Sequence, residues 1–288
     1  MKKLREKYQS ECIRFPKPII WNNEVLIETL ETGMKIDDFI KEYPSRAIRT
    51  RSLRLACYMS MAWYHNLLHA DMHSGNLLYD IDDESGKTYV TILDAGVVAS
   101  LDDSDDMRGL MNSILTLNSE DITRFILKHN KNPNANTKRF YENIHECTER
   151  LNKMSSSSSL DILLSKPGNI ERFFGDKTCD VKHMKALTLS MDNTMEFIQF
   201  VSKSLYTNSI VVDGNMLCFF LGFAIAYGPK MEGCNLLKEA IRIAIREKMC
   251  GDREQMKEWM GCDITMYIEM SDKLETVAKL LGIENFVE

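Results

Sequence analysis

The chain has 288 residues, of which 44% are hydrophobic, and its formal net charge is −6. This is enough apolar material for the core of one large domain or two small ones. The negative charge provides no basic surface of the kind that nucleic-acid-binding proteins present, so we expect no nucleic-acid partner. The longest apolar run, Met216–Tyr227, is too short to cross a bilayer, and it predicts a buried helix rather than a transmembrane segment.

Cysteine usage and the first residues indicate the compartment. The eight cysteines form no C-x-x-C pair and have no regular spacing, which favours reduced thiols over a disulfide framework. The segment Met1–Ser10 is highly charged and has no apolar stretch, so it predicts no secretory signal. We therefore expect an intracellular, soluble and cytoplasmic protein.

The first elements predicted along the chain are short. A charged helix is expected over Met1–Gln9, and two prolines favour an extended course over Phe15–Ile20. Glu24–Glu28 is predicted to be a strand, preceded by a hairpin turn at Trp21–Asn23. A short helix is expected next, over Met34–Lys41, with acidic residues near its start.

A long helix then leads into a polar segment. Apolar residues at helical spacing predict an amphipathic helix over Ser45–Leu68. The segment His69–Asn76 follows, with the sequence H-A-D-M-H-S-G-N. Beyond it, Leu77–Tyr79 and Tyr89–Leu93 are predicted to form a hairpin, and the second strand runs into Asp94-Ala95-Gly96. The order is therefore helix, polar loop, hairpin and acidic residue.

Protein kinases use this order for H-R-D-x-x-x-x-N and D-F-G. Phosphoryl transfer needs a carboxylate near the attacking hydroxyl and hard oxygen ligands for Mg²⁺. Here Asp71 would accept the proton or orient the nucleophile, and Asn76 and Asp94 would hold the metal. Gly96 would let the backbone turn away. An ordinary surface loop is the alternative, because Asp, Ser, Gly and Asn are common in turns. Two motifs in order around a predicted hairpin favour the kinase-type site.

A zinc site is a further alternative. His65, His69 and His73 are four residues apart, so a continuous helix would place them on one face, where three imidazoles could bind zinc. This requires the helix to continue towards Ser74-Gly75-Asn76, which is typical of a helix end. The sequence has no H-E-x-x-H motif. Otherwise His65 would lie on the helix surface and His69 would pack under the loop.

The rest of the chain predicts helices separated by polar loops. Asp102–Asp106 would cap the first of these helices, and Asn130–Asn136 is predicted to be a loop. Ser155–Ser159 is expected to be a flexible joint or the start of a helix. The helices are expected over Met107–Leu117, Ser119–Lys128, Phe140–Met154, Cys179–Leu205, Asp213–Tyr227, Pro229–Met249 and Met260–Leu281.

Three stretches together resemble the UbiB-type atypical kinases, also called the aarF-domain-containing kinases, a family associated with coenzyme Q biology. They are Val25–Lys35, His69–Leu78 and Thr91–Leu101. The catalytic loop of the family has the form H-A-D-x-H-P-G-N, from which this chain departs only at Ser74. The D-F-G of the family is similar to D-A-G here, and its M-E-F-x-x-G hinge resembles the segment before Gly33, with one extra residue.

The resemblance covers residues 4–130 and implies an α+β, mainly helical, protein-kinase-like fold with a site for ATP and Mg²⁺. In a kinase, the hinge binds adenine through backbone groups. The residues that we predict for the site are Asp71 and His69 as catalytic groups, Glu28, Leu30 and His73 in nucleotide binding, and Asn76 and Asp94 as metal ligands.

A kinase amino lobe also needs a nucleotide-covering loop, a strand lysine and a helix glutamate. Only 24 residues precede Val25, the first glycine is Gly33, and the K-x-G-Q element of the family is absent. We therefore expect a truncated amino lobe within a single kinase-like domain over residues 1–288. Its parts would be an amino-lobe remnant with the hinge (1–33), a catalytic-loop core (34–130) and a helical carboxyl-terminal part (131–288).

Loss of the covering loop would remove phosphate contacts and the exclusion of water. We therefore expect weak or absent kinase or ATPase activity at a retained ATP and Mg²⁺ site. The alternatives are a non-catalytic pseudokinase that acts as a scaffold or regulatory binding protein, a truncated gene product, and an enzyme whose site is completed by a protein partner.

Overall fold

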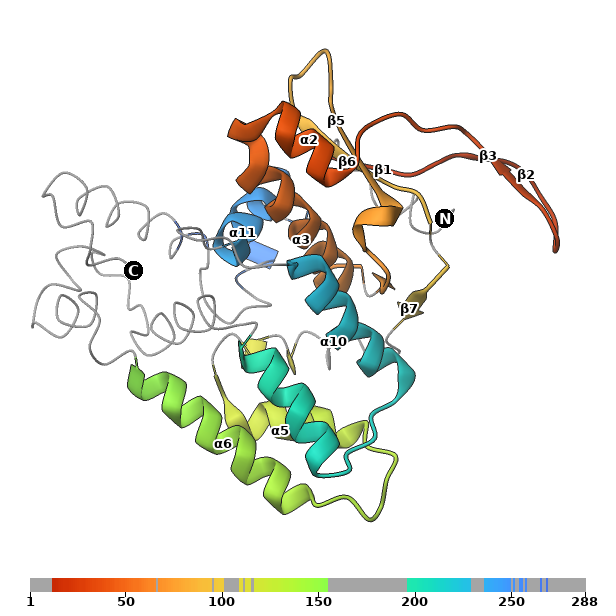
Figure 1. Ribbon diagram of the computed structural model, residues 1–288. Coiled ribbons are helices and arrows are strands. Elements are labelled where there is room, and N and C mark those ends of the chain that lie inside the picture. The colour runs from red at the N-terminus through yellow and green to blue at the C-terminus, as the bar shows by residue number, and fades with distance from the viewer. Residues whose placement is uncertain are drawn as a thin grey trace, which may run out of the picture. The chain divides into compact units, whose positions relative to one another are not determined.

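The computed structural model divides the chain into two units, each of which is described by itself (Figure 1). Unit 1 comprises residues 1–107 and 214–252, and unit 2 comprises residues 108–213 and 253–288. The structure describes residues 12–65, 67–94, 96–100, 109–110, 112–114, 117–154, 196–228, 236–249, 251, 254–255, 257, 265 and 268. The predictions for Met1–Gln9, Asp102–Asp106, Ser155–Ser159 and most of Met260–Leu281 lie outside these residues.

A three-stranded sheet in unit 1 has the order β1–β6–β5. β5 (Leu77–Ile81) and β6 (Thr88–Ile92) are antiparallel, with Tyr79 opposite Val90, and β1 (Ile13–Arg14) pairs with β6 in parallel. All five residues of β6 are buried, as expected for a central strand rich in β-branched and aromatic side chains. The hairpin predicted after the polar loop is therefore confirmed, although β6 begins and ends one residue earlier than predicted.

A second, two-stranded ribbon lies earlier in the chain. β2 (Pro18–Trp21) and β3 (Leu26–Glu28) are antiparallel. Between them, Oδ1 of Asn22 accepts hydrogen bonds from the backbone N–H groups of Glu24 and Val25, at 2.8 Å and 2.7 Å. This confirms the predicted turn, because Asn side chains stabilise turns in this way. In Figure 1 the ribbon extends away from the other elements of unit 1.

Helix α3 (Ala47–Trp63) is the centre of unit 1. Residues 52–62 are all buried, because α3 packs against α10 (Gly214–Tyr227) and α11 (Leu236–Arg246), which are distant in sequence. Most of these buried residues are apolar, and among the polar ones Arg54 has a partner, since its Nε donates to the carbonyl of Ala226 at 2.9 Å. The apolar run that predicted a buried helix is α10, and its prediction is confirmed. None of the described helices combines the length and the apolar character that a membrane span requires.

The prediction of one helix over Ser45–Leu68 is wrong at both ends. The first residues form a separate 3-10 turn at Pro44–Arg46, and α3 ends at Trp63. Leu67–His69 form strand β4 instead, which pairs antiparallel with β7 (Val98–Ser100). A run of apolar residues fits both a buried helix and a buried strand, and here the pairing with β7 decides between them. The short helix predicted before it is α2 (Ile36–Glu42).

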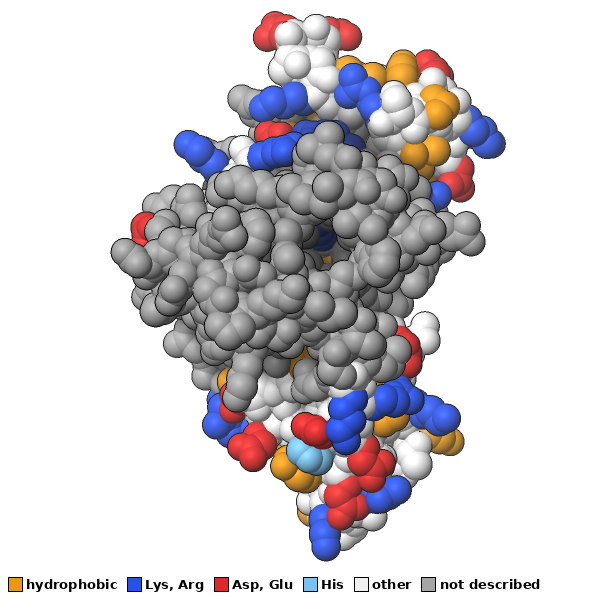
Figure 2. Space-filling model, turned by 90° about the vertical axis from the view of Figure 1, so that its left-hand side faces the viewer, with side chains coloured by type: hydrophobic (Ala, Val, Ile, Leu, Met, Phe, Trp, Pro, Cys, Tyr) orange, Lys and Arg blue, Asp and Glu red, His pale blue; other side chains and the backbone are white. Residues whose placement is uncertain are grey.

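Unit 2 contains α5 (Ser119–Lys128), α6 (Thr137–Met154) and a helical segment at residues 196–207. The predicted bounds of α5 are confirmed, and the side chain of Asn118 caps this helix by accepting from the backbone N–H of Asp121. Figure 2 shows acidic and basic side chains interspersed on the visible face of this unit. On α6, Arg139 and Glu142 form an ion pair at 3.1 Å, which is typical of a solvated helix face.

Candidate nucleotide and metal site

Strands hold the polar loop at both of its ends. β4 ends at His69, opposite Val98 of β7, and β5 begins directly after Asn76, the last residue of the loop. Within the loop, Ser74–Asn76 form one 3-10 turn, η2. The backbone N–H of Leu93 donates to the carbonyl of Asn76 at 2.9 Å. This bond fixes the end of β6 beside the loop, so the residue after Leu93, Asp94, starts from a defined position.

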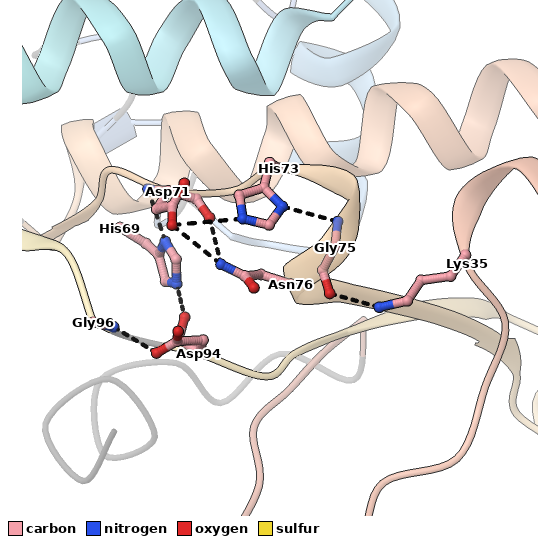
Figure 3. A network of polar contacts seen from close by, with 8 residues as sticks. All are labelled: Lys35, His69, Asp71, His73, Gly75, Asn76, Asp94 and Gly96. Carbon is pink, nitrogen blue, oxygen red and sulfur yellow. Dashed lines mark hydrogen bonds and ion pairs between the residues drawn. The ribbon is translucent and has the colours of Figure 1, made fainter.

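Asp71 and Asn76 are in direct contact. Nδ2 of Asn76 donates to the backbone carbonyl of Asp71 at 3.1 Å and to its carboxylate oxygen Oδ2 at 3.3 Å. Figure 3 shows the two side chains pointing toward each other. Because the amide nitrogen is used in these bonds, Oδ1 of Asn76 is the end of the amide that remains for another ligand. An amide oxygen beside a carboxylate is a donor set for a hard cation.

His69 connects this pair to the second motif. The ring is fully buried. Nδ1 accepts from the backbone N–H of Asp71 at 3.2 Å, and Nε2 donates to the backbone carbonyl of Asp94. A ring that accepts at one nitrogen and donates at the other is neutral. Burial lowers the pKa of His69 below its usual value, although the bond to the Asp94 carbonyl opposes this shift. His69 therefore positions both segments and does not itself face solvent.

His73 lies on the other side of Asp71. Its Nδ1 accepts from the backbone N–H of Gly75 at 2.9 Å, and its Nε2 lies 3.6 Å from Oδ2 of Asp71. The ring is about half exposed. A Cβ atom at position 75 would come within 2.6 Å of this ring, so a larger residue would displace it. Gly75 is thus required for the observed placement of His73 next to Asp71.

Asp94 is exposed, and its Oδ1 accepts from the backbone N–H of Gly96 at 2.8 Å. In Figure 3, His69 lies between Asp71 and Asp94. The carboxylate of Asp94 and the amide oxygen of Asn76 are hard oxygen donors, and neither side chain is buried. Mg²⁺ usually keeps several waters and takes only one or two protein ligands, so these residues fit Mg²⁺.

The predicted hinge residues are not joined to the polar loop. Glu28 ends β3 opposite Pro18, and Leu30 is 95% exposed. Among the described residues, no hydrogen bond or ion pair links either side chain to the loop. After the β2–β3 ribbon, the chain returns to the sheet just beyond Gly33, which has a φ of 130° that favours glycine. There Met34 and Tyr79 exchange two backbone hydrogen bonds, at 2.9 Å and 2.8 Å.

Lys35 is a residue of this site that the sequence analysis missed. Its Nζ donates to the backbone carbonyl of Gly75 at 2.5 Å, so it ties the segment after the hinge to the polar loop (Figure 3). The two residues are 40 positions apart, and no local pattern around Lys35 signals this contact. The only available signal was that Lys35 ends one of the stretches that resemble the UbiB-type family.

The structure contradicts the helix on which the zinc alternative depends. α3 ends before His65, His69 belongs to strand β4, and His73 precedes η2 in an extended conformation. The three imidazoles therefore do not share a helix face. In the part of the chain that the structure describes, no group of three or more His, Cys, Asp or Glu side chains is placed to hold a metal ion.

Comparison with known proteins leads to the same class of protein. Residues 1–128 match the family model of the ABC1 atypical kinase-like domain, and all the residues of the candidate site lie within this match. These findings support an atypical kinase-like protein.

One curated relative is the probable serine/threonine-protein kinase abkC of Dictyostelium discoideum, to which the chain is 41% identical over 80 residues. This similarity covers 27% of the chain and 12% of the relative, so the chain matches only a small part of that protein. No solved structure matches the chain.

Proposed function

We propose that this chain binds an adenine nucleotide together with Mg²⁺ at the site formed by His69–Asn76 and Asp94, as a UbiB-type atypical kinase-like protein. The observation that carries the proposal is the contact of Asn76 with Asp71, together with the bond from buried His69 to the Asp94 carbonyl. Asn76 and Asp94 are 18 residues apart, and these bonds join the Asp71 carboxylate, the Asn76 amide and the backbone of Asp94 in a single polar network. Together with the carboxylate of Asp94, these are the donor groups that phosphoryl transfer requires.

Each residue has a distinct part in this proposal. Asn76 and Asp94 hold the metal ion, which when bound would neutralise phosphate charge. Asp71, fixed by the Asn76 amide, accepts the proton of an attacking hydroxyl or orients it. His69 positions Asp71 and Asp94 through its hydrogen bonds to the backbone of both residues. His73, half exposed beside Asp71, contacts the nucleotide.

The adenine would be bound at the hinge. Backbone groups around Glu28 and Leu30 have the donors and acceptors that the edge of an adenine ring needs. Both residues come before Gly33, where the chain turns to pair with β5. The side chains of Glu28 and Leu30 make no hydrogen bond or ion pair with the polar loop among the described residues. A bound nucleotide would therefore contact the hinge through its adenine and the polar loop through its phosphates.

We further propose that phosphotransfer is weak or absent. The side chain of Asp71 is 37% exposed and that of His73 is 51% exposed, so water reaches the group that would orient the acceptor. Charge stabilisation is less effective in such a site than in one from which water is excluded. This exposure also favours the second candidate function, a non-catalytic pseudokinase that binds nucleotide and acts as a scaffold or regulator.

A nucleotide titration by isothermal calorimetry tests the site. ATP would be titrated into the wild-type chain with and without MgCl₂, and then into Asp94→Ala and into Asp83→Ala as a control. Asp83 is an exposed acidic residue of the β5–β6 turn, away from the network. We expect Mg²⁺-dependent binding that weakens at least about tenfold in Asp94→Ala, or about 1.4 kcal/mol, and is unchanged in the control. Binding without Mg²⁺ dependence, or equal in Asp94→Ala and wild type, would overturn the proposed site.

Turnover separates the two candidate functions. Phosphate release from ATP would be followed with the wild-type chain and with Asp71→Asn, which keeps the side-chain volume and removes the carboxylate. Turnover that disappears in Asp71→Asn indicates an enzyme and contradicts the pseudokinase. Mg²⁺-dependent binding without turnover supports the pseudokinase.

A further inference from the structure

The β2–β3 ribbon carries large apolar side chains in contact with solvent. Three of them lie on or beside β2 and three on or beside β3, and Leu30 follows the ribbon. Their exposed fractions are 55% for Ile19, 61% for Ile20, 65% for Trp21, 51% for Val25, 55% for Leu26, 48% for Ile27 and 95% for Leu30. Many large apolar side chains exposed together on one short ribbon indicate an interaction site.

Both faces of the ribbon contribute to this apolar surface. Trp21 is opposite Leu26, and Ile20 is opposite Ile27. Directly opposite residues share a face, and successive residues alternate between faces. One apolar pair therefore lies on each side of the ribbon. A two-stranded hairpin is marginally stable alone and gains stability from a third strand.

The edges of the ribbon differ in their capacity to accept such a strand. β2 begins with Pro18, which has no N–H to donate, and its pairing with β3 is irregular between Pro18 and Ile20. β3 has no proline, and alternate backbone groups of an antiparallel strand point away from its partner. Within the described part of the chain, β3 pairs only with β2. Its other edge is therefore the one suited to strand addition.

Two acidic residues flank β3, and Lys17, whose backbone pairs with Thr29 just after the strand, is a basic residue near one end. Glu24 precedes the strand and Glu28 ends it. Oε2 of Glu28 is buried and has no hydrogen-bond partner among the described residues. A carboxylate oxygen removed from water without a partner is costly, and a cationic side chain would offset that cost. The charge thus favours an incoming strand with basic residues at its ends.

We propose that the outer edge of β3 binds an extended apolar segment of a partner protein that carries Lys or Arg at its ends, by strand addition. The backbone of the segment would pair with β3, its apolar side chains would cover the two faces, and a basic side chain would meet Glu28. This mode derives affinity from main-chain hydrogen bonds and specificity from alternate side chains. The proposed surface lies outside the polar loop, and it shares Glu28 with the hinge that we propose for adenine.

Three synthetic peptides probe this edge. The first is Lys-Val-Thr-Val-Thr-Val-Lys, the second has glutamate in place of both lysines, and the third has proline in place of the central valine. Each would be titrated into the full chain while the emission of Trp21 is followed, with Trp21→Phe identifying its signal. We expect the lysine peptide to bind at least about tenfold more tightly than either control peptide. Equal affinity of all three, or no binding of the lysine peptide, would overturn the proposal.

Two substitutions locate the contact on the chain. In Glu28→Gln, the lysine peptide should bind at most about threefold more tightly than the glutamate peptide, and the proline peptide should still bind weakly. Glu42→Gln, on the exposed surface of α2, is the control and should leave the affinities of all three peptides unchanged. Ile27→Thr keeps a β-branched residue in the strand and should weaken the lysine peptide. Thermal melting verifies that each variant is folded. If Glu28→Gln leaves the discrimination intact, the charge argument is wrong.

Other occupants of the ribbon give different results. Light scattering would detect a dimer that dissociates in Ile27→Thr, which would assign the surface to a second copy of the chain. Sedimentation with vesicles of phosphatidylcholine and phosphatidylserine that is lost in the same variant would assign it to a membrane. Either result, without selective binding of the lysine peptide, overturns the proposed strand addition.

Discussion

The ring of His69 donates a hydrogen bond from Nε2 to the backbone carbonyl of Asp94. Its other nitrogen accepts from the backbone N–H of Asp71, so one neutral, buried imidazole holds both halves of the candidate site. A histidine in this arrangement acts through the residues that it positions. Its substitution should therefore affect the two acidic residues together.

We expect His69→Phe to destabilise unit 1 by about 1–3 kcal/mol, because the ring volume is kept while the partners of two backbone groups are lost. His69→Ala should cost about 1 kcal/mol more, since it also leaves a cavity. Urea denaturation followed by circular dichroism measures both. His145→Ala, at an exposed position of α6, serves as the control and should cost less than about 1 kcal/mol. Equal stability of His69→Phe and wild type would contradict the bridging role.

Lys35 should matter more for nucleotide binding than for folding. Its side chain is exposed, so the loss of its bond to the Gly75 carbonyl in Lys35→Met should change stability by less than about 0.5 kcal/mol. The same change removes a cation next to the proposed nucleotide site, and it should weaken ATP binding about three- to tenfold. Isothermal calorimetry would measure this effect, with Lys35→Arg expected to retain most of the affinity.

The matched control for Lys35 is Lys41→Met. Lys41 lies on the exposed surface of α2 and pairs only loosely with Asp38, at 3.5 Å. Its loss should leave ATP binding unchanged. If both variants weaken ATP binding equally, the effect comes from net charge, and the specific contact of Lys35 with the loop has no role.

Gly222 of α10 allows a close approach to the polar loop. A Cβ atom at this position would lie 2.8 Å from Cε2 of Tyr58 and 3.3 Å from Cα of Ala70. Gly222→Ala should therefore destabilise unit 1 by about 1–3 kcal/mol, because overpacking forces the neighbours to shift. Gly214→Ala is the control, since nothing lies within 4 Å of its Cβ position. Chemical denaturation should show no loss of stability for Gly214→Ala. If Gly222→Ala is as stable as the wild type, the ring of Tyr58 can move to accommodate the added methyl group.

The residues of the polar loop were predictable because their contacts are local. Asp71 and Asn76 are five positions apart, and the spacing of the motif alone indicates that they act together. Their proposed roles with metal and nucleotide stay predictions. The hairpin that brings Asp94 back to the loop was predictable for a similar reason, since its two strands alternate with turn residues along a short stretch of sequence.

Other features depend on tertiary contacts that no local pattern records. The end of α3 was missed because Leu67 and Leu68 fit a helix as well as a strand, and only pairing with β7 distinguishes the two. Lys35 was missed because its partner lies in a distant loop. The contacts of Glu247 were not predictable for the same reason. This residue lies after α11, and it contacts Arg49 of α3 and Lys87 of the β5–β6 turn.

Glu247 supplies a prediction about pH. Its carboxylate lies 3.0 Å from Nη2 of Arg49 and 3.1 Å from Nζ of Lys87, and only 11% of its side chain is exposed. Burial acts to raise the pKa of Glu247, but the hydrogen bonds from Lys87, Arg49 and Cys12 outweigh it and hold this pKa below its usual value of 4.5. Burial, which is the larger cause, and the adjacent Glu247 together raise the pKa of the Cys12 thiol to about 11. The thiol therefore stays protonated and can donate a hydrogen bond to Glu247.

Because the folded-state pKa of Glu247 lies below the unfolded-state value, the unfolded chain takes up this proton first as the pH falls. The contribution of Glu247 to stability is therefore complete above about pH 5 and is lost as the pH falls through the folded-state pKa. Glu247→Gln should cost about 1–3 kcal/mol near pH 7, because Arg49 and Lys87 lose a charged acceptor, and the difference from wild type should shrink towards about pH 3. Urea denaturation at a series of pH values measures this difference. Glu149→Gln, at an exposed position of α6, should follow the wild type throughout, and a difference for Glu247→Gln that stays constant with pH would show that the charge of Glu247 contributes nothing.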